Sequence, residues 1–177
     1  MVDLSHTRVS WDTVTKTGVR PSGWPEAALK VKLWDFPGFG PMTRVDTMSG
    51  PFPAQALRVG DRVRTKRGAF AEIRWVDRVV LDEEFLHHHP EAQPVLIPAK
   101  SLGRGVPAHD VMLSPGQKVN LDGLLMPRSS CVASDLVRAN GARRKIETML
   151  TYTMFLCAKP EEVKVEGLWV RLEPPHW

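Results

Sequence analysis

Two stretches of the sequence decide the fold: GFGPMTRV at residues 38–45 and ALRVGDRV at residues 56–63. The whole chain has 177 residues, of which 42% are hydrophobic and 25% are charged. This composition is typical of one globular domain with a real hydrophobic core. The chain also contains 13 glycines and 15 prolines, so turns are frequent and long helices are not expected.

From about residue 42 onward, the pattern of side chains is typical of β-strands. Apolar and charged residues alternate along residues 71–79, which predicts an extended segment with one apolar face. The apolar residues of that face are Ala71, Ile73, Trp75 and Val79. Lys66-Arg67-Gly68 predicts a short turn that joins this segment to a strand at 62–65, so that the two form a hairpin.

Several short elements follow along the chain. The apolar run at 94–98 is bracketed by prolines, which predicts a strand at the edge of a sheet or at a crossing. Asp122-Gly123 lies between apolar runs and predicts a two-residue hairpin turn with positive φ at both residues. One helical turn is predicted at 134–141, and two final strands at 150–157 and 163–172. Many short strands with Gly- and Pro-rich turns predict an all-β fold.

The order of these motifs resembles the Hedgehog/intein (Hint) domain family, of the bacterial type that stands outside the true inteins. The stretch at 56–63 is similar to the family's Leu-x-Val-Gly-Asp-x-Val segment, and the stretch at 38–45 is similar to its opening. Three further stretches resemble the family in order and spacing: HPEAQPVLI at 89–97, LGRGVPAHDVMLSP at 102–115 and GLWV at 167–170. The resemblance runs from about Gly38 to Leu172.

The resemblance implies an architecture. We expect an all-β, Hint-like horseshoe of short strands, built from two related halves, at residues 37–177. Residues 1–36 are expected to form an irregular N-terminal extension. Trp11, Trp24 and Trp34 lie in this extension, and we expect them to dock it on the domain because an exposed tryptophan is uncommon.

The resemblance also implies a self-processing reaction, but the residues for it differ here. In the family, a cysteine at the first position of the domain attacks the preceding carbonyl, and a histidine protonates the departing amide nitrogen. Gly38 stands at the cysteine position and Gln117 at the histidine position. Met154 falls near a second histidine position that many relatives carry. We therefore interpret Gly38, Gln117 and Met154 as vestigial positions of a lost catalytic site, and we predict that they lie close together.

Other residues offer a nucleophile, but each of them also fits a structural role. Cys131 is the best candidate for a replacement nucleophile, although Cys131 and Cys157 both also fit the role of small buried thiols. Thr43 could attack through its hydroxyl, but the family uses this residue at the start of a strand.

The histidines raise two possibilities, a metal site and a hydrolase triad, and the sequence pattern favours neither. Residues 87–89 are three consecutive histidines, and on an extended chain they would point to alternating faces and could not converge on one metal ion. His109, Asp110 and Ser114 resemble a hydrolase triad in composition only. We predict no metal and no cofactor.

Two functions from different classes remain. The first is a non-catalytic Hint-like protein that acts as a binding or interaction module; the second is an autocatalytic self-processing domain that uses unrecognised residues. The net charge of +4 is scattered along the chain, which favours a protein partner over nucleic acid. No run approaches the roughly 20 apolar residues of a membrane span, and no signal peptide is recognisable, so we expect a cytoplasmic location without membrane contact.

Overall fold

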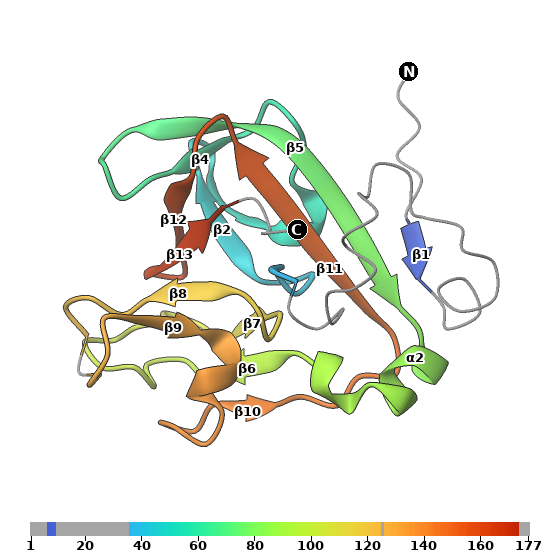
Figure 1. Cartoon of the computed structure of the whole chain (residues 1–177). Helices are drawn as coiled ribbons and strands as arrows, with labels where there is room; N and C mark the ends of the chain where they lie inside the picture. Colours follow the sequence, from blue (N-terminus) through green and yellow to red (C-terminus); the bar gives the residue numbers. More distant parts are fainter. Residues whose placement is uncertain (1–6, 10–35, 125, 174–177) are drawn as a thin grey trace.

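The computed structural model describes residues 7–9, 36–124 and 126–173 (Figure 1). Its single α-helix within these residues is α2 (Glu83–His88), and short 3-10 helices cover Ala54–Ala56, Pro90–Ala92 and Ala133–Leu136. All other regular elements are strands, which confirms the all-β fold. They are β1 (Thr7–Val9), β2 (Arg44–Thr47), β3 (Gly50–Pro53), β4 (Arg62–Arg64), β5 (Phe70–Leu81), β6 (Val95–Ile97), β7 (Val111–Leu113), β8 (Lys118–Asn120), β9 (Ser130–Val132), β10 (Arg143–Arg144), β11 (Leu150–Cys157), β12 (Glu161–Val165) and β13 (Leu168–Leu172).

The strands form one large sheet and one small sheet. The large sheet has the order β1-β5-β4-β2-β12-β13-β8-β9, with β11 paired to β5 and β3 paired to β2. The small sheet has the order β10-β6-β7. Figure 1 shows the long β5–β11 pair crossing the molecule diagonally, with β2, β4, β12 and β13 near one end and α2 at the other. The large sheet is therefore curled, as expected for a Hint-like horseshoe.

The predicted hairpin between β4 and β5 is confirmed. The two strands pair antiparallel, and the Thr65 N–H donates to the Ala69 carbonyl at 2.9 Å across the turn. The Thr65 hydroxyl donates to the same carbonyl at 2.8 Å, so the side chain reinforces the turn.

The predicted apolar face of β5 is wrong at Trp75. Ile73 is fully buried, whereas Trp75 is 39% exposed. The cause is a β-bulge, because the β11 residues Leu156 and Cys157 pair with Trp75 and Ile73, respectively. Arg74 is thus an extra residue on β5, and an extra residue shifts the alternation of side chains on its strand.

The prediction for Asp122-Gly123 is wrong in its turn type. Only Gly123 has positive φ (77°), and residues 121–129 separate β8 from β9. A two-residue turn of the predicted kind occurs instead at Glu166-Gly167, between β12 and β13, with φ of 51° and 89°. The predicted strand at 163–172 is therefore a hairpin of two strands.

Three smaller predictions also need correction. The run at 94–98 does form a strand, but β6 lies in the middle of the small sheet because β10 and β7 pair with its two sides. His87 and His88 belong to α2, where the Asp82 side chain accepts from the Phe85 N–H and caps the helix, so they are not extended. The helical turn predicted at 134–141 covers Ala133–Leu136.

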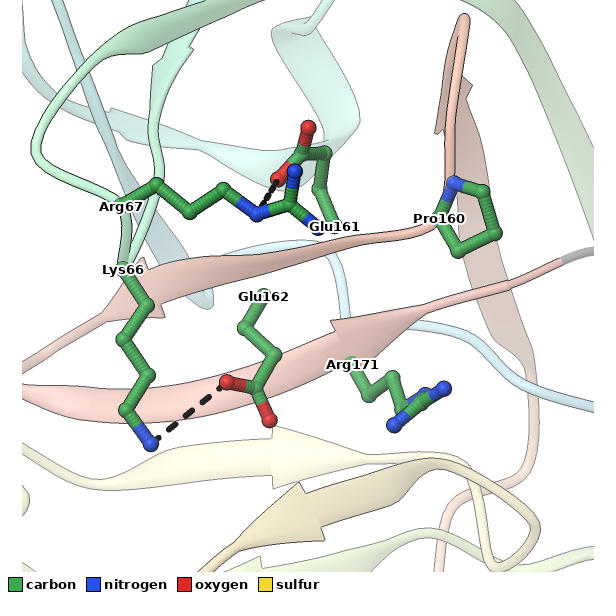
Figure 2. A pocket seen from close by; sticks show the side chains of 6 residues that line it. All are labelled: Lys66, Arg67, Pro160, Glu161, Glu162 and Arg171. Carbon is green, nitrogen blue, oxygen red and sulfur yellow. Dashed lines mark ion pairs between the residues drawn. The ribbon is translucent and has the colours of Figure 1, made fainter.

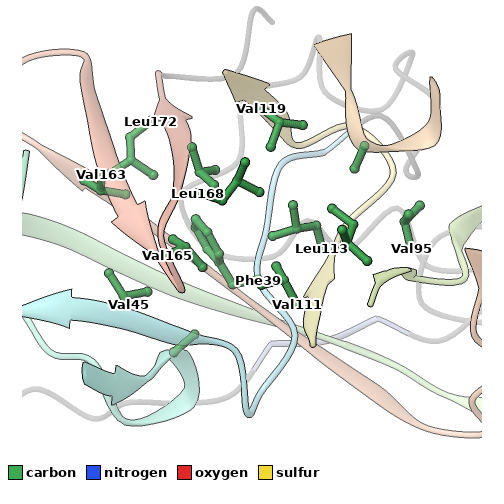
Figure 3. Close-up of a cluster of buried hydrophobic side chains, with 14 of the residues drawn as sticks. Phe39, Val45, Val95, Val111, Leu113, Val119, Val163, Val165, Leu168 and Leu172 are labelled. Atoms are coloured by element: carbon green, nitrogen blue, oxygen red, sulfur yellow. The ribbon is translucent and has the colours of Figure 1, made fainter. Parts of the chain in front are cut away.

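Among the described residues, the core consists of two clusters that lie on either side of β11. The larger cluster includes Phe39, whose ring stacks on Phe155 with 5.2 Å between centroids. Figure 3 shows Phe39 among Val111, Leu113 and Val165, which come from β7 and β12. The smaller cluster packs α2 against the other face of β11 through Phe36, Val79, Leu81, Phe85, Leu86, Ala92, Leu150, Tyr152 and Met154.

The N-terminal region contributes one described element. β1 pairs in parallel with the end of β5, with Thr7 opposite Val79. Trp11, Trp24 and Trp34 lie outside the described residues. No helix in the described part of the chain is long and apolar enough to cross a membrane.

Candidate functional site

The candidate site is built around the segment 36–40, which main-chain hydrogen bonds hold on both sides. Phe39 exchanges N–H···O bonds of 2.9 Å with Thr153 of β11 in both directions. On the other side, the Ser114 N–H donates to the Gly38 carbonyl at 2.9 Å and the Gly40 N–H donates to the Met112 carbonyl at 2.8 Å. The segment is thus fixed between β11 and the end of β7.

Gln117 closes this site from the side of β8. Its side chain is 1% exposed, and its Oε1 accepts from the Gly38 N–H at 3.0 Å. Its Nε2 donates to the Arg171 carbonyl at 2.9 Å and to the Lys118 carbonyl at 3.3 Å. The predicted closeness of Gly38 and Gln117 is confirmed, and the same side chain links the start of the domain to the end of β13.

Two glycines in the segment are explained by close packing. Neither Gly38 nor Gly40 has positive φ. A Cβ at Gly40 would lie 2.7 Å from the Met112 Cβ, so this position accepts only glycine without rearrangement. A Cβ at Gly38 would lie 3.0 Å from the Tyr152 Cβ, so a side chain there fits only if Tyr152 moves slightly.

Met154 lies one residue after Thr153, whose backbone is hydrogen-bonded to Phe39. The residue that pairs with Phe39 is Thr153, and the Met154 side chain packs in the smaller core cluster, against α2. Because neighbouring side chains on a strand point to opposite faces, Met154 and Phe155 belong to different clusters.

Thr153 carries a buried hydroxyl without a hydrogen-bond partner. The residue is fully buried, and its Oγ1 makes no hydrogen bond in the structure. Burial of a hydroxyl without a partner costs roughly 1–3 kcal/mol.

We predict that Thr153→Val raises the free energy of unfolding by about 1 kcal/mol, because valine has nearly the same shape and no polar group. Urea denaturation of the two proteins measures this difference. Thr153→Ser, which keeps the hydroxyl and loses a methyl group, is the control and is expected to destabilise. A loss of stability in Thr153→Val would show that the hydroxyl has a partner.

Cys131 lies on β9 and Cys157 ends β11, four residues beyond Thr153, and both thiols are held in the protonated form. Burial raises the pKa of the Cys131 thiol above its usual range, and the Asp135 carboxylate raises it further. Burial, with a further contribution from Glu161, raises the pKa of Cys157 to about 11. Since the thiolate is the nucleophile, both cysteines are weak nucleophiles at neutral pH.

The residues that resemble a hydrolase triad do not assemble into one. The Ser114 hydroxyl donates to the Phe36 carbonyl, and the Asp110 Oδ1 accepts from the Ala99 N–H at 2.8 Å. The His109 Nδ1 lies 2.8 Å from the Glu166 Oε2. No group of three or more metal-binding side chains occurs among the described residues.

The sequence did not predict the cluster that His109 joins. The Glu166 side chain is only 7% exposed, and its Oε1 accepts from the Arg44 Nε at 2.5 Å. The Arg44 Nη2 lies 2.6 Å from the His109 Nδ1. The three residues are far apart in the sequence, and the one local signal was the Glu-Gly pair at 166–167, which forms the hairpin turn.

A comparison with protein families now identifies the fold. The model of a family described as the Hint domain matches residues 37–171, which is more than half of the chain. The chain belongs to the Hint domain family. Among curated proteins, no sequence matches this Hint protein.

Solved structures similar to this Hint protein include inteins. A variant of the gp41-1 intein is 12% identical, with a TM-score of 0.50 over 76% of this chain and 98% of the intein. The MchDnaB-1 intein is 11% identical, with a TM-score of 0.49 over 76% of this chain and 99% of the intein. At such identities a similar structure indicates the fold and not the activity.

Proposed function

We propose that this Hint domain has lost self-processing and acts as a binding module, with its domain boundary at residue 37. One observation carries the proposal: the amide at the start of the domain donates its N–H to a buried glutamine. The Gly38 nitrogen would be the leaving nitrogen of an acyl shift, and the Gln117 amide lies 3.0 Å from it. This bond supports the proposal, because neither glycine nor glutamine has a side chain suited to the reaction.

The first missing element is the nucleophile. Glycine has no side-chain atom that could attack the Pro37 carbonyl. Thr43 is the nearest hydroxyl in the sequence, but its Oγ1 donates to the Met112 carbonyl at 2.9 Å and accepts from the Met112 N–H at 3.0 Å. This hydroxyl is therefore occupied in fixing β2 against β7.

The second missing element is the acid. A glutamine amide can donate and accept hydrogen bonds, but it cannot deliver a proton at neutral pH. General acid–base catalysis contributes roughly 10²–10⁴-fold to a rate. Loss of this contribution together with the nucleophile leaves no route by which Gly38 and Gln117 could cleave the chain.

The self-processing alternative would have to use another nucleophile, and Cys131 is the candidate. Its raised pKa disfavours it, since few thiol groups are ionised at neutral pH. Cys131 also lies on β9 opposite Val119, whereas the segment 36–40 is held by β11 and Gln117. We therefore favour the non-catalytic function.

Incubation of the purified full chain with a thiol or hydroxylamine tests this proposal. We expect intact-mass spectrometry to find only the full-length protein, while an active Hint protein treated in parallel is cleaved. Thiol-dependent fragments that separate at Pro37–Gly38 would refute the proposal. If Cys131→Ala abolished such fragments, Cys131 would be the replacement nucleophile.

A further inference from the structure

Two cavities lie next to each other on the outer side of the β12–β13 hairpin. The smaller has a volume of about 200 Å³ and is lined by Lys66, Arg67, Pro160, Glu161, Glu162 and Arg171 (Figure 2). The larger, of about 460 Å³, reaches across β8 to β9, and its lining includes Lys118 of β8 and Glu173, which follows β13. Glu162 and Arg171 line both cavities, so together these form one groove across the sheet. A volume of several hundred Å³ is that of a ligand site.

Charged side chains in this groove are arranged in two levels. The carboxylates are the more buried groups, with side-chain exposures of 12% for Glu161, 17% for Glu173 and 24% for Glu162. The cations are more exposed, at 36% for Lys66, 47% for Lys118, 53% for Arg171 and 74% for Arg67. We call the three carboxylates the floor and the four cations the rim. A ligand that enters the groove therefore meets positive charge first.

The floor also fixes the rim in place. Lys118 donates to the Glu173 carboxylate, and the Arg171 Nε donates to the same carboxylate at 2.7 Å. These bonds lower the pKa of Glu173, the Lys118 bond being the largest cause, so the Glu173 carboxylate is ionised at neutral pH. Lys118 and Arg171 are thus ordered before a ligand arrives, which reduces the entropy lost on binding.

Arg171 is a rim cation that is anchored by one hydrogen bond and still has unused donors. It lies on β13 opposite Glu162, and its Nε is bound to Glu173. Within the described part of the chain, its Nη1 and Nη2 make no hydrogen bond. Figure 2 shows its guanidinium pointing away from Glu162, whose carboxylate is turned toward Lys66. A guanidinium with free Nη groups is suited to a carboxylate, which it can bind through two parallel hydrogen bonds.

We propose that this groove binds an extended peptide through one internal Asp or Glu side chain, held by Arg171. The proposal rests on the proposed function, since it names the partner of the binding module. An internal acidic residue fits because Arg171 lies where the two cavities meet, so flanking residues can occupy both. A nucleic acid fits poorly, because the three floor carboxylates offset three of the four rim cations. The one remaining positive charge is too little for a chain of phosphates.

Fluorescence anisotropy with a labelled nonapeptide tests this proposal. The probe has a central Glu in a Ser- and Thr-rich sequence with capped ends, and its matched control has Gln in place of Glu. We expect the Glu peptide to bind the full-length protein about tenfold more tightly than the Gln peptide. Arg171→Gln is expected to remove this preference, whereas Lys164→Gln, on β12 outside both cavities, is expected to keep it.

Further measurements keep the result interpretable. An unchanged melting temperature of Arg171→Gln would show that this variant is folded. Lys118→Gln is expected to weaken binding of the Glu peptide by a smaller factor than Arg171→Gln does. Equal binding of the two peptides, or no binding, would overturn this proposal. Tighter binding of single-stranded oligothymidylate than of the Glu peptide would also overturn it, in favour of nucleic acid. Intact-mass spectrometry of the same samples reports separately on the proposed loss of self-processing.

Discussion

Phe39→Ala is expected to lower the free energy of unfolding by about 3–5 kcal/mol, the usual range for removal of a buried phenylalanine ring. Phe39 is 1% exposed and stacks on Phe155, and its backbone joins the segment 36–40 to β11. Domains of this size have total stabilities of about 5–15 kcal/mol, so a large part of the stability depends on this ring. Urea denaturation of the variant and the unaltered protein measures the loss.

Phe52→Ala is the matched control, because it removes the same ring from a position that is 41% exposed. We expect a loss of less than about 1 kcal/mol there. An equal loss in both variants would mean that Phe39 is not at the centre of the core. A changed dependence on urea concentration would instead indicate that the variant alters the compactness of one of the two states.

The sequence predicted the parts of the fold that local signals determine. The β4–β5 hairpin follows from alternation and a three-residue turn, and both are properties of neighbouring residues. The bulge at Arg74 could not be predicted, because it depends on the register of β11, more than 70 residues further along the chain. Exposure of Trp75 is a consequence of that register.

The two Gly-containing turns also show that residues far along the chain can determine a local backbone conformation. Asp122-Gly123 has the composition of a tight hairpin turn, yet Glu166-Gly167 adopts one. Glutamate rarely takes positive φ. At residue 166 the side chain is held by Arg44 and lies 2.8 Å from His109, and contacts of this kind can stabilise an unfavourable backbone conformation. Those partners come from elsewhere in the sequence.

The candidate site was predictable where a motif gave each residue a position. Gly38 and Gln117 were placed by two separate stretches, and the hydrogen bond between them joins residues that are 79 positions apart. The position of Met154 was less well fixed, because one residue along a strand reverses the face of the side chain. The buried Thr153 hydroxyl without a hydrogen-bond partner could not be predicted from any feature of the sequence.

Gln117→Leu is expected to destabilise the protein by about 2–4 kcal/mol, although leucine has a similar size and greater hydrophobicity. The substitution leaves the buried Gly38 N–H and the partly buried Arg171 carbonyl without their present partner. Each such group costs roughly 1–3 kcal/mol, and the greater hydrophobicity of leucine recovers part of this loss. Amide hydrogen exchange provides a direct readout, since the Gly38 amide is expected to exchange faster in the variant than in the unaltered protein.

Gln117→His is the informative counterpart, because a neutral imidazole has one donor and one acceptor. It has an acceptor for the Gly38 N–H and a donor for the Arg171 carbonyl, so we expect a smaller loss of stability than in Gln117→Leu. If both variants lost the same amount, the shape of the glutamine, and not its hydrogen bonds, would explain its burial. If neither variant lost stability, Gln117 would not hold the segment 36–40 in place, and the geometric basis of the candidate site would fail.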